Sequence, residues 1–91
     1  MTQPGFTIAW SSPARRTLAR LPEKAASAVI ELIYGAIAEN PQHVGRALSA
    51  PLQGLQSARR GDFRVIYRID SAAARVTVIA IGHRSDIYRR R

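Results

Sequence analysis

Apolar and polar residues alternate with a period of two in several segments of the chain. In the first of them, Phe6, Ile8 and Trp10 share one side, which is typical of a strand with one buried face. The strand segments that this pattern predicts are residues 5–11, 55–60, 62–70 and 75–82. The last segment is apolar on both faces, as a central strand is. Residues 70–74 form a hairpin loop between the last two strands in this interpretation.

Between the first two strands, the apolar residues follow the period of a helix. Ser12 and Pro13 are interpreted as the N-cap and first turn of a short amphipathic helix, which ends before Pro22. A second helix then runs to about Glu39, and Asn40 follows it as a cap. Two such helices need a sheet to bury their apolar stripes. We therefore predict an α+β fold of order β-α-α-β-β-β, with a helical hairpin on one face of a small, mostly antiparallel, four-stranded sheet.

These periodicities also predict which side chains form the core. The expected core residues are Phe6, Ile8, Trp10, Leu18, Leu21, Val29, Ile30, Ile33, Ile37, Phe63, Val65, Tyr67, Ile79 and Ile81. With 91 residues the chain is expected to be a single domain, residues 1–91, ending in a basic tail over residues 83–91. We expect neither a membrane span nor a signal peptide, and the absence of cysteine excludes disulfides and thiol nucleophiles.

Charge is the compositional feature that departs from the average. The chain carries a formal net charge of +8, and its 14 basic residues include a single lysine, Lys24. Most of the excess lies in residues 46–91, where arginines far outnumber the three aspartates Asp62, Asp70 and Asp86. Guanidinium groups hold phosphates in a bidentate manner and stack on bases. This distribution favours a nucleic acid or an acidic protein as the partner.

Motifs for cofactor or metal chemistry are absent from the sequence. There is no glycine-rich phosphate loop and no cluster of metal ligands, so we expect neither a cofactor nor a metal site. Strand alternation instead places Arg64 and Arg68 on one side of segment 62–70, away from its apolar side. If the helices cover one sheet face, the other face is open and lined with arginine.

Two motifs in the C-terminal half resemble a known family. Segment 57–70 (SARRGDFRVIYRID) and segment 78–88 (VIAIGHRSDIY) are similar to the RelE branch of the RelE/ParE toxin superfamily, over roughly residues 5–88. The resemblance implies the toxin of a type II toxin–antitoxin system. Such a toxin is a cytoplasmic endoribonuclease, an mRNA interferase that cuts mRNA in the ribosomal A site by attack of the RNA 2′-hydroxyl. It also implies a monomer when free, and a hetero-oligomer with a small acidic, RelB-like antitoxin.

The family's functional positions map onto individual residues here. The resemblance implies catalytic roles for Arg64, Arg84 and Tyr88. The best-studied members of this branch carry two lysines at the positions of Leu55 and Ser57 in this chain. The nearby arginines that we expect to bind RNA are Arg59, Arg60, Arg68, Arg89 and Arg90.

Two questions stay open at the level of sequence. The general base is Tyr88, His83 or neither, and strand parity turns His83 to the face opposite Arg84. The function has two alternatives to the nuclease: a ParE-like inhibitor of DNA gyrase, favoured by loss of the lysines, and an RNA-binding module without catalysis. Retention of the arginines and of Tyr88 favours the nuclease.

Overall fold

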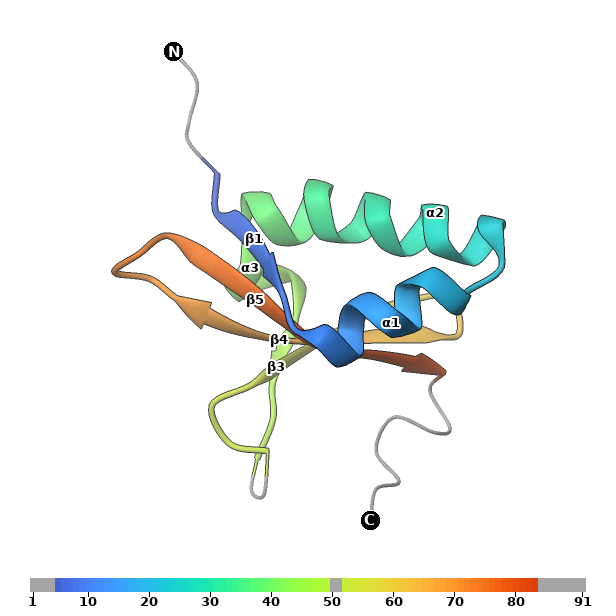
Figure 1. The fold of residues 1–91 in the computed structure, drawn as a ribbon. Helices are drawn as coiled ribbons and strands as arrows, with labels where there is room; N and C mark the ends of the chain where they lie inside the picture. The colour runs from blue at the N-terminus through green and yellow to red at the C-terminus, as the bar shows by residue number, and fades with distance from the viewer. Residues whose placement is uncertain (1–4, 50–51, 84–91) are drawn as a thin grey trace.

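The computed structural model describes residues 5–49 and 52–83. Its elements, in chain order, are β1 (Thr7–Trp10), α1 (Ser12–Arg20), α2 (Glu23–Glu31), the π-helical segment η1 (Leu32–Ile37), α3 (Pro41–Val44), β2 (Arg46–Ala47), β3 (Gln56–Arg60), β4 (Phe63–Asp70) and β5 (Arg75–His83). Figure 1 shows α1, and α2 with its continuation η1, on the same side of the sheet. In the described part of the chain, no helix is long and apolar enough to cross a membrane.

The strands form one sheet of order β1-β5-β4-β3-β2. β1 runs parallel to β5, and the other neighbours are antiparallel. The α+β class, the helical hairpin on one face and the mostly antiparallel sheet are thus confirmed. The predicted count of four strands is wrong, because β2 adds a fifth. A strand of two residues, Arg46 and Ala47, is too short to show a period of two, so its pairing with β3 left no signal in the sequence.

A serine joins the start of α1 to the centre of the sheet. The N-cap is Ser11 rather than the predicted Ser12, and the Ser11 hydroxyl accepts a hydrogen bond from the Ala14 N–H at 3.1 Å. The same hydroxyl donates to the carbonyl of Ile79 in β5 at 2.8 Å. Ser11 therefore caps the helix and also fixes it to the neighbouring strand.

That carbonyl belongs to a bulge in β5. Opposite β4, Ile66 pairs with Ala80 and Tyr67 pairs with Val78, so Ile79 is skipped. One extra residue reverses the side-chain alternation of β5 beyond the bulge. Val78 and Ile81 consequently both reach the core, whereas Ile79, which simple alternation placed in the core, is only half-buried.

The core lies between the helices and the sheet. Ile33 and Ile37 in η1 are fully buried, and Val29 in α2 continues the same stripe. A π-helical turn rotates less per residue than an α-helical turn, which keeps residues four apart on the same side. Ile30, also predicted to be core, lies beside this stripe and is half-buried. The remaining predicted residues, apart from Ile79, are either buried or packed against the buried cluster.

Candidate functional site

The pairing of β3 with β4 separates the C-terminal arginines onto two sides of the sheet. Residues directly opposite each other in an antiparallel pair point to the same face. Ala58 pairs with Val65 on the face that the helices cover, here called the helix face. Arg59 and Arg64 pair with each other on the opposite face, here called the arginine face. Arg64 therefore lies on the face away from the helices, as strand alternation predicted, and Arg59 lies beside it.

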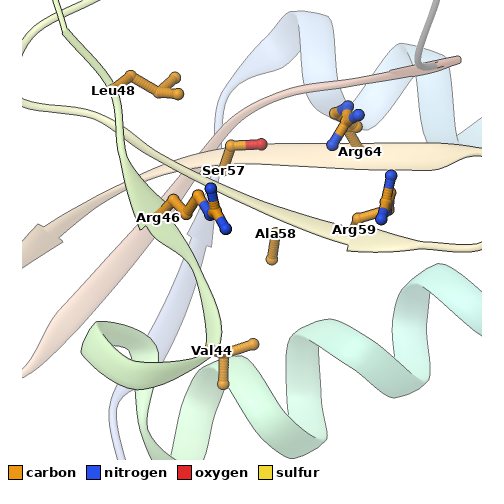
Figure 2. Close-up of a pocket in the computed structure, with 7 residues that line it drawn as sticks. All are labelled: Val44, Arg46, Leu48, Ser57, Ala58, Arg59 and Arg64. Carbon is orange, nitrogen blue, oxygen red and sulfur yellow. The ribbon is translucent and has the colours of Figure 1, made fainter.

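β2 adds a third arginine to this group. Arg46 pairs with Ser57, which lies two residues before Arg59 on β3 and shares its face. β2 begins only at Arg46, which lies opposite Ser57, so the part of β3 beyond Ser57 has no strand on its outer side among the described residues. A pocket of about 420 Å³ opens along this edge. Figure 2 shows the side chains that line it: Val44, Arg46, Leu48, Ser57, Ala58, Arg59 and Arg64.

The pocket is strongly electropositive. Three of its lining residues are arginines and none is acidic. Within residues 5–49 and 52–83, neither Arg46 nor Arg59 forms an ion pair, and both are exposed. Val44 and Leu48 add apolar walls, which lower the local dielectric and strengthen attraction for an anion. Such a site suits phosphate groups, which arginine holds through charge-assisted hydrogen bonds.

Arg46 was missed by the sequence analysis, which predicted no element between the cap Asn40 and the strand segment that begins at residue 55. The available signal was the pair Gly45-Arg46 directly after a possible short helix that begins at Pro41. Only the pairing of β2 with β3 shows that this arginine reaches the same pocket as Arg59 and Arg64.

The hydroxyl of Tyr67 holds the chain in place just before Arg46. Tyr67 is fully buried and donates a hydrogen bond to the Pro41 carbonyl at 2.7 Å, while the Gly45 N–H donates to the same hydroxyl oxygen. Burial raises the pKa of Tyr67 to about 12, although the Gly45 hydrogen bond lowers it in part. A Cβ at Gly45 would overlap the Tyr67 hydroxyl and lie 2.9 Å from the Ser57 carbonyl oxygen. This close approach requires glycine at position 45.

Two of the other arginines expected to bind RNA lie outside the pocket lining. Arg60 lies opposite Phe63 and reaches the helices, where its Nη2 contacts Glu31 Oε1 at 3.0 Å. Arg68 pairs with Thr77 on the arginine face and is exposed.

The candidate base His83 is on the helix face. It pairs with Phe63, and the two rings pack edge to face with centroids 6.0 Å apart. Arg64 instead lies opposite Gly82, so His83 and Arg64 alternate to opposite sides of the sheet.

The two positions at which the resemblance implies lysine in other family members differ in their surroundings. Ser57 is buried and lines the pocket, whereas Leu55 precedes β3 and is half-buried. Four predicted site residues lie outside the described residues: Arg84, Tyr88, Arg89 and Arg90. Among the described residues, no three His, Asp or Glu side chains lie close enough to hold a metal ion together.

Comparison with known proteins adds an independent observation. Residues 8–88 match the family model described as the ParE toxin of the type II toxin–antitoxin system parDE. Two proteins of Mycobacterium tuberculosis are similar over most of their length. Toxin RelE is 46% identical over an alignment that covers 92% of this chain and 87% of that protein. Toxin RelG is 41% identical over an alignment that covers 93% of this chain and 98% of that protein. A chain in the crystal structure of the toxin–antitoxin complex RelBE2 from the same organism is 36% identical, with a TM-score of 0.85 over 93% of this chain and 98% of that one.

Proposed function

Because the chain belongs to the family of ParE toxins of type II toxin–antitoxin systems, we propose that it is an endoribonuclease that cuts mRNA in the ribosomal A site and thereby inhibits translation. The observation that carries this proposal is the pairing of Arg59 with Arg64 in an open pocket without acidic residues. A pair of arginines beside each other matches the oxygens of one phosphate group.

The proposed reaction uses the nucleophile that RNA itself supplies. The 2′-oxygen attacks the adjacent phosphorus, the bond from phosphorus to the 5′-oxygen breaks, and a cyclic phosphate and a 5′-hydroxyl result. The 2′-hydroxyl loses its proton and the leaving 5′-oxygen gains one. The guanidinium groups of Arg59 and Arg64 stabilise the extra charge on the phosphate oxygens as the transition state forms.

Proton transfer needs a different group from these arginines. The Tyr67 hydroxyl is unsuited, because it is buried, hydrogen-bonded to Pro41 and Gly45, and has a pKa of about 12. His83 lies on the opposite sheet face from Arg64. Tyr88 remains in the proposal, either as the base or by stacking on a nucleotide to align the 2′-oxygen. Arg84 is proposed to share the phosphate-binding role of Arg64.

The decisive experiment is single-turnover cleavage of mRNA on programmed ribosomes, read by primer extension. Arg64→Ala is expected to slow cleavage by about 10²–10³, the scale for losing one preorganised donor, with little change in ribosome binding. Arg15→Ala is the matched control, since it removes the same charge from an exposed position on α1. Equal cleavage by both variants would contradict the proposal, as would a wild-type protein that leaves mRNA intact.

Two variants at position 88 separate the possible roles of Tyr88. If the ring stacks, Tyr88→Phe cuts nearly as fast as wild type and Tyr88→Ala is severely slowed. If the hydroxyl is the base, both variants are slow, and the rate loses its dependence on pH at the basic side.

A second candidate function is inhibition of DNA gyrase, which the ParE name of the matching family model favours. The same preparation tested in a gyrase supercoiling assay distinguishes the two. Inhibited supercoiling without cuts in translated mRNA would replace the nuclease by this alternative. A protein that binds RNA but neither cuts mRNA nor inhibits supercoiling would be an RNA-binding module without catalysis.

The proposal includes an acidic antitoxin as partner. The similar RelBE2 structure is a toxin–antitoxin complex, and the net charge of +8 favours a partner rich in carboxylates. We propose that both proteins meet in the cytoplasm, where mRNA is translated. Electrostatic steering makes their association rate fall as salt rises, and a rate that is insensitive to salt would argue against a carboxylate-rich partner.

A further inference from the structure

We propose that Arg46 binds a second phosphate of the RNA, next to the one held by Arg59 and Arg64, and so sets how tightly the strand binds rather than how fast it is cut. This inference rests on the proposed RNA substrate. The observations that carry it are the position of Arg46 in the pocket, its separation from the other two arginines, and the way its backbone is held.

Arg46 lies apart from the Arg59–Arg64 pair although it lines the same pocket. Figure 2 shows the Arg59 and Arg64 side chains near each other, with Arg46 on the other side of Ser57. Arg46 pairs with Ser57 on one side of β3, and Arg64 pairs with Arg59 on the other. Two strand spacings and a two-residue step along β3 put the Cα atoms of Arg46 and Arg64 about 12 Å apart. When Arg59 and Arg64 hold one phosphate, Arg46 is therefore in a position to hold the neighbouring phosphate.

The backbone before Arg46 is held more firmly than an ordinary loop. Gly45 is fixed by its N–H bond to the buried Tyr67 hydroxyl, which in turn donates to Pro41. Directly after Gly45, Arg46 enters its pairing with Ser57. Arg46 therefore starts from a defined position on the pocket rim, although its side chain is exposed. A preorganised cation loses less freedom on binding than one on a mobile loop.

A phosphate next to the reacting one keeps its charge throughout the reaction. An arginine that holds it binds the ground state and the transition state equally, and such uniform binding affects the half-saturating concentration but not the maximal rate. Arg64 at the reacting phosphate behaves in the opposite way. Substitution of Arg46 is therefore expected to change the half-saturating concentration, whereas substitution of Arg64 in the same pocket changes the maximal rate.

The first test measures binding without cleavage. The probe is a single-stranded RNA oligonucleotide with 2′-O-methyl groups throughout, which has no nucleophile. Arg46→Gln is expected to reduce the slope of log affinity against log salt by about 0.7, the contribution of one phosphate contact on a single strand. Arg15→Gln on α1 is the matched control and leaves the slope unchanged, and Arg46→Lys restores it. An unchanged slope in Arg46→Gln would overturn the inference.

The second test locates the phosphate. On programmed ribosomes, Arg46→Gln is expected to raise the half-saturating protein concentration roughly tenfold, as for a lost charge-assisted hydrogen bond, with the maximal rate within about twofold of wild type. With a neutral methylphosphonate placed beside the scissile phosphate, wild type and Arg46→Gln then behave alike. A maximal rate that falls as in Arg64→Ala would overturn the inference. If the wild type cuts no mRNA, the nuclease proposal fails by itself, and the salt slope still decides whether Arg46 binds phosphate.

Discussion

The two faces of the sheet are built from the same strands but differ in charge, because apolar side chains pack on one face and arginines gather on the other. On the helix face, Val65, Tyr67 and Val78 are fully buried against the helices. On the arginine face, Arg59 and Arg64 are neighbours on adjacent strands, although like charges placed opposite each other disfavour pairing. Burial of apolar side chains on the helix face supplies the free energy of folding. Part of this free energy offsets the repulsion between the neighbouring cations on the arginine face.

This difference shows how an exposed pocket can be kept in shape by groups that lie beneath it. β4 carries Tyr67 on one face and Arg64 on the other, so its burial against the core also fixes the pocket. The Tyr67 hydroxyl extends this support across the sheet edge to Gly45 and β2.

The largest effect on stability is expected beneath the helices. Ile33→Ala removes a fully buried side chain from η1 and is expected to lower the free energy of unfolding by about 2–5 kcal/mol. Ile30→Ala is the matched control, because Ile30 is only half-buried one turn away. Urea unfolding followed by circular dichroism measures both. A loss below half a kcal/mol at Ile33 would remove it from the core.

The support by Tyr67 predicts a loss of stability in alkali. The pKa of Tyr67 is raised from 10.0 to about 12 in the folded protein, so the unfolded state gives up this proton first. Stability is therefore unaffected by this group below pH 10 and falls by up to about 3 kcal/mol as the pH rises to 12. Tyr67→Phe is less stable at neutral pH but is expected to show a flatter profile between pH 10 and 12. Identical profiles for wild type and variant would exclude Tyr67 as the cause.

Gly45→Ala tests the close approach at the edge of the sheet. The added methyl group meets the Tyr67 hydroxyl and the Ser57 carbonyl, and such overpacking costs about 1–3 kcal/mol of stability. Gly35→Ala in η1 is the control, since nothing lies within 4 Å of a Cβ there. The variant Gly45→Ala is also expected to bind RNA more weakly, because Arg46 shifts with it. Normal stability and binding together would contradict the tethering role of Gly45.

The smallest effect concerns the arginine that points to the helices. Arg60 and Glu31 form an ion pair between side chains that are 45% and 71% exposed, so Arg60→Gln is expected to change stability by less than about 1 kcal/mol. Arg60 does not line the pocket, so the variant is also expected to leave the rate of mRNA cleavage unchanged. Cleavage slowed as strongly as in Arg64→Ala would place Arg60 in the site despite its orientation.

The sequence determined the architecture because the period of apolar residues within a segment decides which of its faces is buried. The alternation around Phe63, Val65 and Tyr67 gave both the buried side of β4 and the open side that carries Arg64. The helical hairpin followed in the same way from residues spaced three and four apart.

Only the tertiary structure decided features that depend on one or two residues. A single extra residue at Ile79 reversed the alternation of β5, and no local pattern indicates where such a bulge falls. A two-residue strand brought Arg46 into the pocket through its partner Ser57, eleven positions away in the chain. The apolar pattern identifies Tyr67 only as an aromatic core residue. Its buried hydroxyl, however, holds Gly45 in place and thereby positions the pocket rim. Local sequence specifies which face of an element is apolar, whereas pairing between distant segments decides which polar groups meet.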